Sequence, residues 1–204
     1  FSGPIFLHAH SLGTLIGLHL AHILPTRNPD LSIRAIGMTG VALNPGPGAA
    51  SPFGMQSLFC LAQLGACTRG LACCLGTIAP SAPNAPIIEA ALTSDADQLA
   101  IHNKDPWIYH GEIMNKTAFT VLQLEASARD LVPAVNVPFF LIHGADDTIT
   151  FPSGSQYFFD HASTAPENKR IKIVPHARHE VFHETHEIRT QAMEEMRDWY
   201  LQHL

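Results

Sequence analysis

The feature that most constrains this 204-residue sequence is a serine between an apolar segment of strand length and an apolar segment with helical periodicity. Residues 4–9 form the first segment. In residues 12–24, apolar side chains recur at steps of three and four residues, as they do along one face of a helix. We expect Pro25 to end that helix. Ser11 therefore lies at a strand-to-helix turn.

The residues around Ser11 are small. Ala9 and Gly13 stand two positions before and after it, which is the spacing of the G-x-S-x-G nucleophile elbow with Ala in the first Gly position. A serine in such a turn projects its hydroxyl from the sheet if no bulky side chain stands nearby. The helix start that follows offers free N–H groups and a positive dipole end to an oxyanion. The alternative for this segment is a serine that only caps a buried helix.

Both ends of the chain alternate between strand-like and helix-like segments. The expected strands after the first one are residues 33–43, 137–143 and 170–174, and the expected helices are residues 153–162 and about 187–203. The last helix carries an apolar face made of Ile188, Ala192, Met196, Trp199 and Tyr200. Strands that alternate with helices predict a parallel α/β sheet with right-handed crossovers.

The alternation stops between residues 46 and 135. This stretch contains a Pro-rich loop at residues 80–86 and a helical pattern at residues 117–131. It predicts a mainly helical cap inserted over the carboxyl edge of the sheet, where open α/β sheets bind ligands. The predicted division is therefore a core segment at 1–45, a cap at 46–135 and a second core segment at 136–204.

Composition excludes several classes of protein. Hydrophobic residues make up 46% of the chain and charged residues 15%, and the net charge of −6 shows no blocks that would indicate a nucleic-acid surface. No apolar stretch reaches the roughly 18 residues that a membrane span needs. The four cysteines lack paired CxxC spacing, so we expect reduced thiols and a cytoplasmic protein; they are Cys60, Cys67, Cys73 and Cys74.

A serine nucleophile needs a base, and the base needs a carboxylate that orients it. Asp146 and Asp147 follow the predicted strand at residues 137–143, and His176 and His179 follow the strand at 170–174. The chain order serine, carboxylate, histidine, with each residue at a strand end, is that of the serine α/β-hydrolases. Position alone leaves both carboxylates and both histidines open.

Five segments resemble the monoglyceride lipase and lysophospholipase branch of the serine α/β-hydrolases: residues 9–13, 105–111, 143–147, 152–157 and 177–180. The resemblance covers almost the whole chain. It implies an α/β-hydrolase fold with a helical cap that receives an acyl chain, and hydrolysis of monoacylglycerol or lysophospholipid esters without a metal or cofactor. The family pattern selects Ser11 as nucleophile, Asp147 as orienting acid and His179 as base.

The resemblance and the geometry of the elbow together make the backbone N–H of Leu12 one oxyanion donor. The family's second donor lies in a His-Gly loop after an early strand, and this sequence contains no such segment. The first strand would also leave an apolar edge bare, which favours aggregation. We therefore expect the sequence to be the C-terminal part of a longer protein, with the N-terminal strands of the fold missing.

Two other functions compete with this interpretation. Residues 179–183 spell H-E-x-x-H, the motif of helical zinc hydrolases, for which Glu194 or Glu195 would be the third ligand. The other alternative is a hydrolase-like binding protein with impaired catalysis.

Two further expectations concern the cap and the histidines. Apolar residues of the cap would contact a membrane surface peripherally; they are Phe53, Met55, Leu58, Phe59, Leu61 and Leu64. Nine histidines show no spacing that converges on a metal, so we expect surface or hydrogen-bonded structural roles for them; they are His8, His10, His19, His22, His102, His110, His143, His161 and His203. His10 in particular should pack or hydrogen-bond locally.

Overall fold

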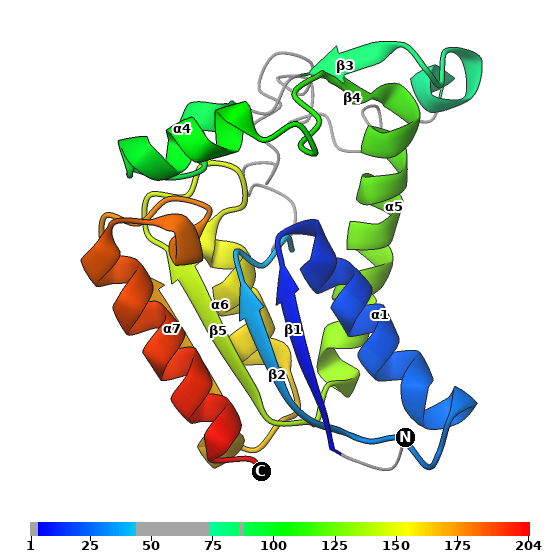
Figure 1. Cartoon of the computed structure of the whole chain (residues 1–204). Coiled ribbons are helices and arrows are strands. Elements are labelled where there is room, and N and C mark those ends of the chain that lie inside the picture. The colour runs from blue at the N-terminus through cyan, green and yellow to red at the C-terminus, as the bar shows by residue number, and fades with distance from the viewer. Residues whose placement is uncertain (1–3, 44–73, 86–87) are drawn as a thin grey trace.

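The computed structural model describes residues 4–43, 74–85 and 88–204. A four-stranded sheet has the order β1-β2-β5-β6, and every neighbouring pair is parallel. Its strands are β1 (Ile5–His10), β2 (Ile33–Thr39), β5 (Phe139–Gly144) and β6 (Lys169–Val174). All four therefore end at one edge of the sheet, the upper edge in Figure 1. The predicted parallel α/β sheet is confirmed.

Helices cover both faces of the sheet (Figure 1). Side chains of β2 and β5 alternate between two cores. Ile36 and Phe139 pack with α1 (Leu12–Arg27) and α6 (Pro152–His161), whereas Ala35 and Phe140 pack with α7 (His186–Leu201). Continuous burial on both faces explains why these strands are apolar without alternation. The predicted apolar face of the last helix is confirmed, because all five of its residues belong to or pack on the second core.

Helix α1 does not end at Pro25, so that prediction is wrong. The helix continues to Arg27, and the N–H of Asn28 donates to the carbonyl of Leu24 at 2.8 Å. A proline removes only its own N–H donor and crowds one carbonyl four residues back. The N–H groups of the residues after Pro25 still find acceptors, so the helix forms a last turn beyond the proline.

The apolar stripe of α1 is only partly buried. Leu15 and Leu18 are fully buried, while the other side of the stripe is exposed at Ile16, Leu20 and Ile23. Gly17 lies at the contact between α1 and the sheet, where an added Cβ would lie 3.4 Å from side-chain atoms of Ala9, Leu7 and Met38. Small and large apolar side chains therefore make this contact together.

Most of the described insertion lies over the carboxyl edge of the sheet, while its last helix, at residues 115–131, runs down beside α1 (Figure 1). It contains β3 (Pro83–Ala85), η2 (Glu89–Ala91), α4 (Ala96–Lys104), β4 (Ile113–Met114) and α5 (Asn115–Leu131). Strands β3 and β4 form an antiparallel pair, and neither that pair nor α4 was predicted. Ala128 at the end of α5 belongs to the core on the α1 face. The proposed boundaries at 45 and 135 stay predictions.

Short 3₁₀ turns complete the described elements: η3 (Val132–Ala134), η4 (Pro166–Asn168) and η5 (Val181–His183). None of the helices within the described ranges has the length and apolarity that a membrane crossing requires. Cys74 is a free, exposed thiol. The other three cysteines and the apolar cap residues 53–64 lie outside the described residues.

Candidate active site

Ser11 occupies a strained turn between the last residue of β1 and the first residue of α1. Its φ of 51° and ψ of −125° lie in a region that non-glycine residues rarely adopt and that costs roughly 1–3 kcal/mol. Two hydrogen bonds hold the turn. The Ser11 N–H donates to Thr39 O at 3.1 Å, and Thr14 N donates to Ser11 O at 2.9 Å. The strain at this serine is what a nucleophile elbow requires.

The small residues around Ser11 have different reasons to be small. Ala9 is buried and faces Gly17 of α1 across the close helix–strand contact. At Gly13 an added Cβ would meet no atom of the described residues within 4 Å. Steric crowding therefore explains Ala9, while the described part of the structure gives no steric reason for Gly13.

The structure brings the three predicted side chains together in one chain of hydrogen bonds. Nε2 of His179 lies 2.9 Å from Ser11 Oγ, and its Nδ1 lies 2.8 Å from Asp147 Oδ2. Asp147 and His179 are buried, whereas the neighbouring candidates Asp146 and His176 are exposed. Because the carboxylate can only accept, Nδ1 carries the proton and Nε2 is left to accept from the serine hydroxyl. The catalytic roles of these residues stay predictions.

Five donors surround the Asp147 carboxylate. Its Oδ1 accepts from the N–H groups of Ile149 at 2.8 Å and Thr150 at 3.0 Å. Its Oδ2 accepts from the Thr150 hydroxyl at 2.9 Å, from His179, and from Nε2 of His143 at 3.0 Å. Burial alone would raise the pKa of Asp147, but the hydrogen bonds from His143 and His179 hold it well below its usual range.

His143 is a supporting residue that sequence reasoning missed. It is fully buried at the end of β5, and its Nε2 also lies 2.8 Å from the carbonyl of Thr150. A carbonyl only accepts, so Nε2 carries the proton and Nδ1 accepts from the Ser155 hydroxyl at 2.7 Å. His143 thereby donates from Nε2 to Oδ2 of Asp147. The signal was its position four residues before Asp147, in the same His-Gly-x-x-Asp pattern that selected the acid.

Gly40 makes room for the imidazole of His179. It directly follows β2 and ends the strand earlier than predicted, with a φ of 55°. A Cβ at this position would lie 3.1 Å from Cε1 of His179, which is tighter than ordinary van der Waals contact. A glycine is therefore required both by the backbone conformation and by the ring above it.

His10 hydrogen-bonds to side chains that lie beside it in space, as predicted. Its Nδ1 lies 2.8 Å from the Thr39 hydroxyl, and its Nε2 lies 3.1 Å from Oε1 of Glu180. The ring centroids of His10 and His179 are 4.8 Å apart. Burial would raise the pKa of Glu180, but the hydrogen bond and charge of His10, with smaller contributions from His179 and His183, lower it to about 2. Glu180 is therefore a carboxylate at neutral pH beside the His179 ring.

The loop that carries His179 is tied to the insertion. Glu184 is fully buried and accepts from the N–H of Ser94 at 3.1 Å, from the Ser94 hydroxyl, and from the N–H of Arg178 at 2.7 Å. The N–H of Glu180 donates to Leu92 O at 2.7 Å. The bonds from Ser94 to Glu184 and from Glu180 to Leu92 join segments that are far apart in the sequence, so the position of His179 depends on the insertion as well as on the sheet.

Leu12 is the first residue of α1, where N–H groups have no acceptor within the helix. This placement suits the predicted oxyanion donor, whose role no contact in the described residues tests.

The helix that the zinc motif requires does not form at residues 179–183. Val181–His183 is a 3₁₀ turn, and the imidazole of His179 is engaged with Ser11 and Asp147. The side chain of His183 is 61% exposed and contacts Glu180. Within the described ranges, the His, Asp, Glu and Cys side chains that gather closely enough for a metal are Glu89, His102 and His110. The expectation that no histidines converge is therefore wrong for this pair.

Comparison with known proteins gives one family match. The sequence model of the family described as "Serine aminopeptidase, S33" matches residues 2–186. The chain is 28% identical to the monoglyceride lipase homolog of Monkeypox virus over 196 residues, which are 96% of this chain and 62% of that protein. It is 24% identical to the monoglyceride lipase of Rattus norvegicus over 198 residues, which are 96% of this chain and 58% of that protein.

Solved structures show the same arrangement of elements. The crystal structure of Paleococcus ferrophilus monoacylglycerol lipase matches with a TM-score of 0.74 and 24% identity, over 98% of this chain and 68% of that one. The chain spans about three fifths of the length of each of the two curated relatives named above.

Proposed function

Because the chain belongs to the family described as serine aminopeptidase, S33, and has the α/β-hydrolase fold, we propose that it hydrolyses carboxylic esters of small lipids. The proposed substrates are monoacylglycerols or lysophospholipids. The observation that carries the proposal is the hydrogen-bonded chain from Ser11 through His179 to Asp147 at the carboxyl edge of the sheet. The names of the two curated relatives, a monoglyceride lipase homolog and a monoglyceride lipase, support the lipid part.

The proposed reaction has two halves. In the first, Ser11 Oγ bonds to the acyl carbonyl carbon while His179 Nε2 takes its proton, and the oxyanion faces the Leu12 N–H. The intermediate collapses, and the leaving alcohol takes the proton from His179. In the second half, water attacks the acyl-enzyme with His179 again as base, which releases the fatty acid and restores Ser11.

Asp147 supports both halves through charge. Its carboxylate stabilises the imidazolium that forms when His179 takes a proton, and it fixes the tautomer that leaves Nε2 free to accept. The lowered pKa of Asp147 keeps its carboxylate ionised at neutral pH.

Intact mass after treatment with a fluorophosphonate tests the nucleophile. We expect a single adduct that is absent in Ser11→Ala and persists in Ser81→Ala, a matched control in an exposed turn. No adduct on folded protein would contradict the proposal and favour the hydrolase-like binding protein. Hydrolysis rates are then measured in parallel with a monoacylglycerol and with an aminoacyl p-nitroanilide. The comparison distinguishes ester hydrolysis from the aminopeptidase activity that the family's description names.

We also propose peripheral contact of the cap with lipid surfaces. Its support within the described residues is an exposed apolar group, with Trp107 at 93%, Tyr109 at 70% and Ile101 at 63% exposure. Co-sedimentation with phosphatidylcholine vesicles should weaken in Trp107→Ala. Ile23→Ala, which changes an exposed apolar residue of α1 outside the insertion, should bind as the unchanged protein does. Equal binding of both variants would contradict the proposed contact.

A further inference from the structure

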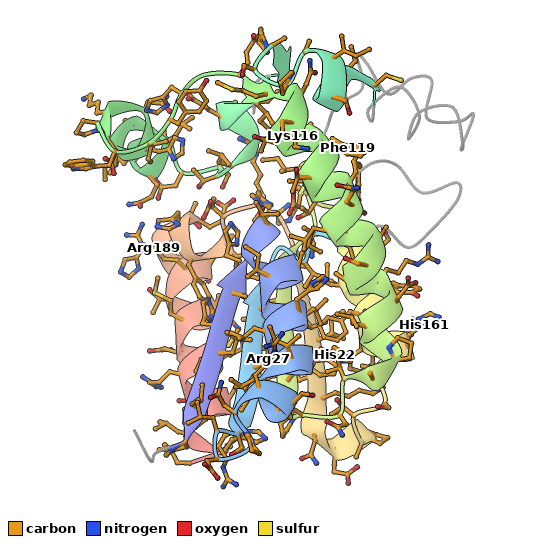
Figure 2. All side chains as sticks on the ribbon, turned by 90° about the vertical axis from the view of Figure 1, so that its right-hand side faces the viewer. His22, Arg27, Lys116, Phe119, His161 and Arg189 are labelled. Atoms are coloured by element: carbon orange, nitrogen blue, oxygen red, sulfur yellow. The ribbon has the colours of Figure 1, made fainter. Side chains whose placement is uncertain are left out.

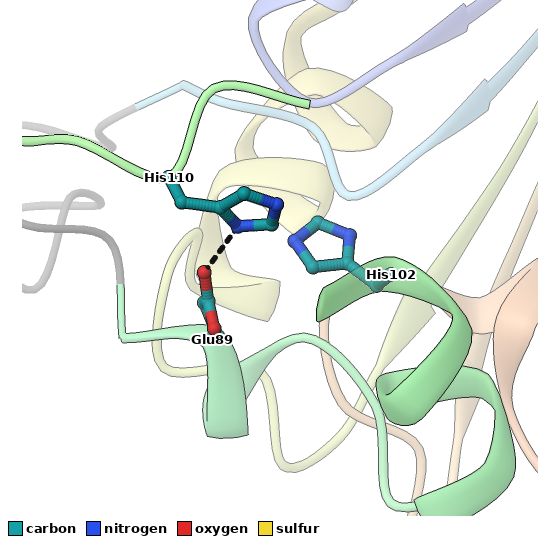
Figure 3. Close-up of side chains that lie close together, drawn as sticks. All are labelled: Glu89, His102 and His110. Carbon is teal, nitrogen blue, oxygen red and sulfur yellow. Dashed lines mark hydrogen bonds and ion pairs between the residues drawn. The ribbon is translucent and has the colours of Figure 1, made fainter. Parts of the chain in front are cut away.

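We propose that Glu89, His102 and His110 form a binding site for a divalent transition-metal ion, with zinc as the ion whose preferences they match best. The three residues come from η2, from α4 and from the segment after α4 (Figure 3). Each offers one ligand atom, and these atoms all lie within 4.8 Å of one another. Imidazole nitrogen and carboxylate oxygen are ordinary zinc ligands. None of the three takes part in the candidate active site.

The side chains point toward one another (Figure 3). Oε1 of Glu89 lies 2.7 Å from Nδ1 of His110, and the rings of His102 and His110 meet edge to face with centroids 5.6 Å apart. Ligand atoms around a tetrahedral zinc lie about 3.4 Å apart. The Glu89–His110 pair must therefore open slightly and His102 must move inward. These are rotations of partly exposed side chains, which meet little steric resistance.

Neighbouring groups hold two of the ligands from behind. Nε2 of His110 lies 3.4 Å from the carbonyl of Asp105, which leaves Nδ1 facing Glu89 and His102. In the amide orientation that satisfies both of its polar atoms, Asn103 donates to Oε2 of Glu89 at 2.9 Å and leaves Oε1 facing the histidines. Metal-binding histidines and carboxylates are oriented by this kind of outer hydrogen bond.

An ion pair between Glu89 and His110 explains the placement of these two side chains but not that of His102. His102 is half-buried and its ring faces this pair, yet its nitrogens have no hydrogen-bond partner among the described residues. A free imidazole aimed at a carboxylate and a second imidazole is explained by a ligand between them. Three protein ligands leave the fourth tetrahedral position for water.

The site would brace the insertion over the loop of His179. Glu89 begins the turn whose last residue, Ala91, accepts from the N–H of His179 at 3.5 Å, and Leu92 accepts from Glu180 at 2.7 Å. A metal ion that joins this turn to α4 would restrict its motion. We therefore assign the ion a structural role in the cap rather than a role in the reaction.

Isothermal titration of the chelator-treated protein with zinc chloride tests the site. We expect one zinc ion per chain, and a rise in Tm of roughly 5–10 °C when free zinc exceeds Kd about 100-fold. The double variant His102→Ala/His110→Ala should weaken zinc binding by roughly a hundredfold or more. The matched control is His22→Ala/His161→Ala, which removes two exposed histidines from α1 and α6 (Figure 2) and should bind normally.

Absence of zinc binding, or equal binding by the double variant and the unchanged protein, would overturn the proposal. Circular dichroism without zinc checks that the double variant folds. If it does not fold, Glu89→Gln decides the question, because it keeps a hydrogen-bonding side chain beside His110 but removes the charged ligand. Weakened zinc binding by folded Glu89→Gln supports the site, and unchanged binding rejects it.

Discussion

Replacing Asp147 with asparagine is the sharpest test of the hydrogen-bonded chain, because it changes one oxygen to an NH₂ group without changing shape. Oδ1 of the asparagine can still accept from Ile149 and Thr150. The new NH₂ group would then face Nδ1 of His179 and Nε2 of His143, both of which donate to the native carboxylate. To avoid two opposed donors, His179 must move its proton to Nε2.

That tautomer is the wrong one for the proposed reaction, because a protonated Nε2 donates to Ser11 instead of accepting from it. We expect kcat for a monoacylglycerol to fall by about 10⁴-fold, as for the same change in other serine hydrolases with this arrangement. His143 loses one acceptor and keeps only the Thr150 carbonyl. The stability should therefore fall by about 1–3 kcal/mol, or roughly 2–4 °C in Tm for each kcal/mol.

Initial rates with monoacylglycerol and thermal unfolding measure the two effects separately. The matched control is Asp146→Asn, which removes the adjacent exposed carboxyl and should leave both quantities unchanged. An Asp147→Asn protein that keeps more than about a tenth of the native kcat would refute the reasoning, since a tautomer-locked base cannot sustain that rate.

Three other substitutions test the surroundings of His179. Glu184→Ala removes a fully buried carboxylate that accepts from the N–H groups of Ser94 and Arg178, so urea denaturation should show a loss of about 2–4 kcal/mol. The pKa of Glu180 is lowered to about 2, so its stabilising effect is present above pH 4.5 and is lost as the pH falls toward 2; Glu180→Gln should flatten the pH dependence of Tm in that range. Gly40→Ala pushes a methyl group against His179, and kcat should fall about 10–100-fold with a smaller change in KM.

Much of the sheet could be predicted because its strands are apolar runs that end in turn residues. The prediction from local sequence was wrong at Pro25, because a proline near the end of a helix removes one hydrogen bond without ending the helix. It also missed α4, although Asp95 caps that helix by accepting from the N–H groups of Asp97 and Gln98. That signal was readable in the sequence. The β3–β4 pair could not be predicted, because its two very short strands exist only through hydrogen bonds between residues that are far apart in the insertion.

The place of the hydrogen-bonded chain from Ser11 to Asp147 was predictable from topology, whereas the choice of Asp147 over Asp146 and of His179 over His176 came from the family pattern. Parallel strands end at one edge, so residues that follow three different strands must meet there. The residues that support this chain could not be found in the same way. Glu184 owes its role to contacts that burial creates, and nothing in its immediate sequence distinguishes a buried acceptor from a solvated glutamate. His143 has a signal in the His-Gly-x-x-Asp pattern, but that pattern does not tell which groups the buried ring contacts.

The connection between the insertion and His179 follows from where these supporting groups lie. Residues of the strands and of the segments that directly follow them hold Asp147 and Ser11, whereas the loop of His179 is held through Glu184 and the Glu180 N–H by residues 92–94 of the insertion. A displacement of that part of the insertion must therefore break these hydrogen bonds or move His179 with it. A shift of about 1 Å at a general base is enough to cost two orders of magnitude in rate. In the proposed reaction, the position of the insertion thus affects the chemical step through His179.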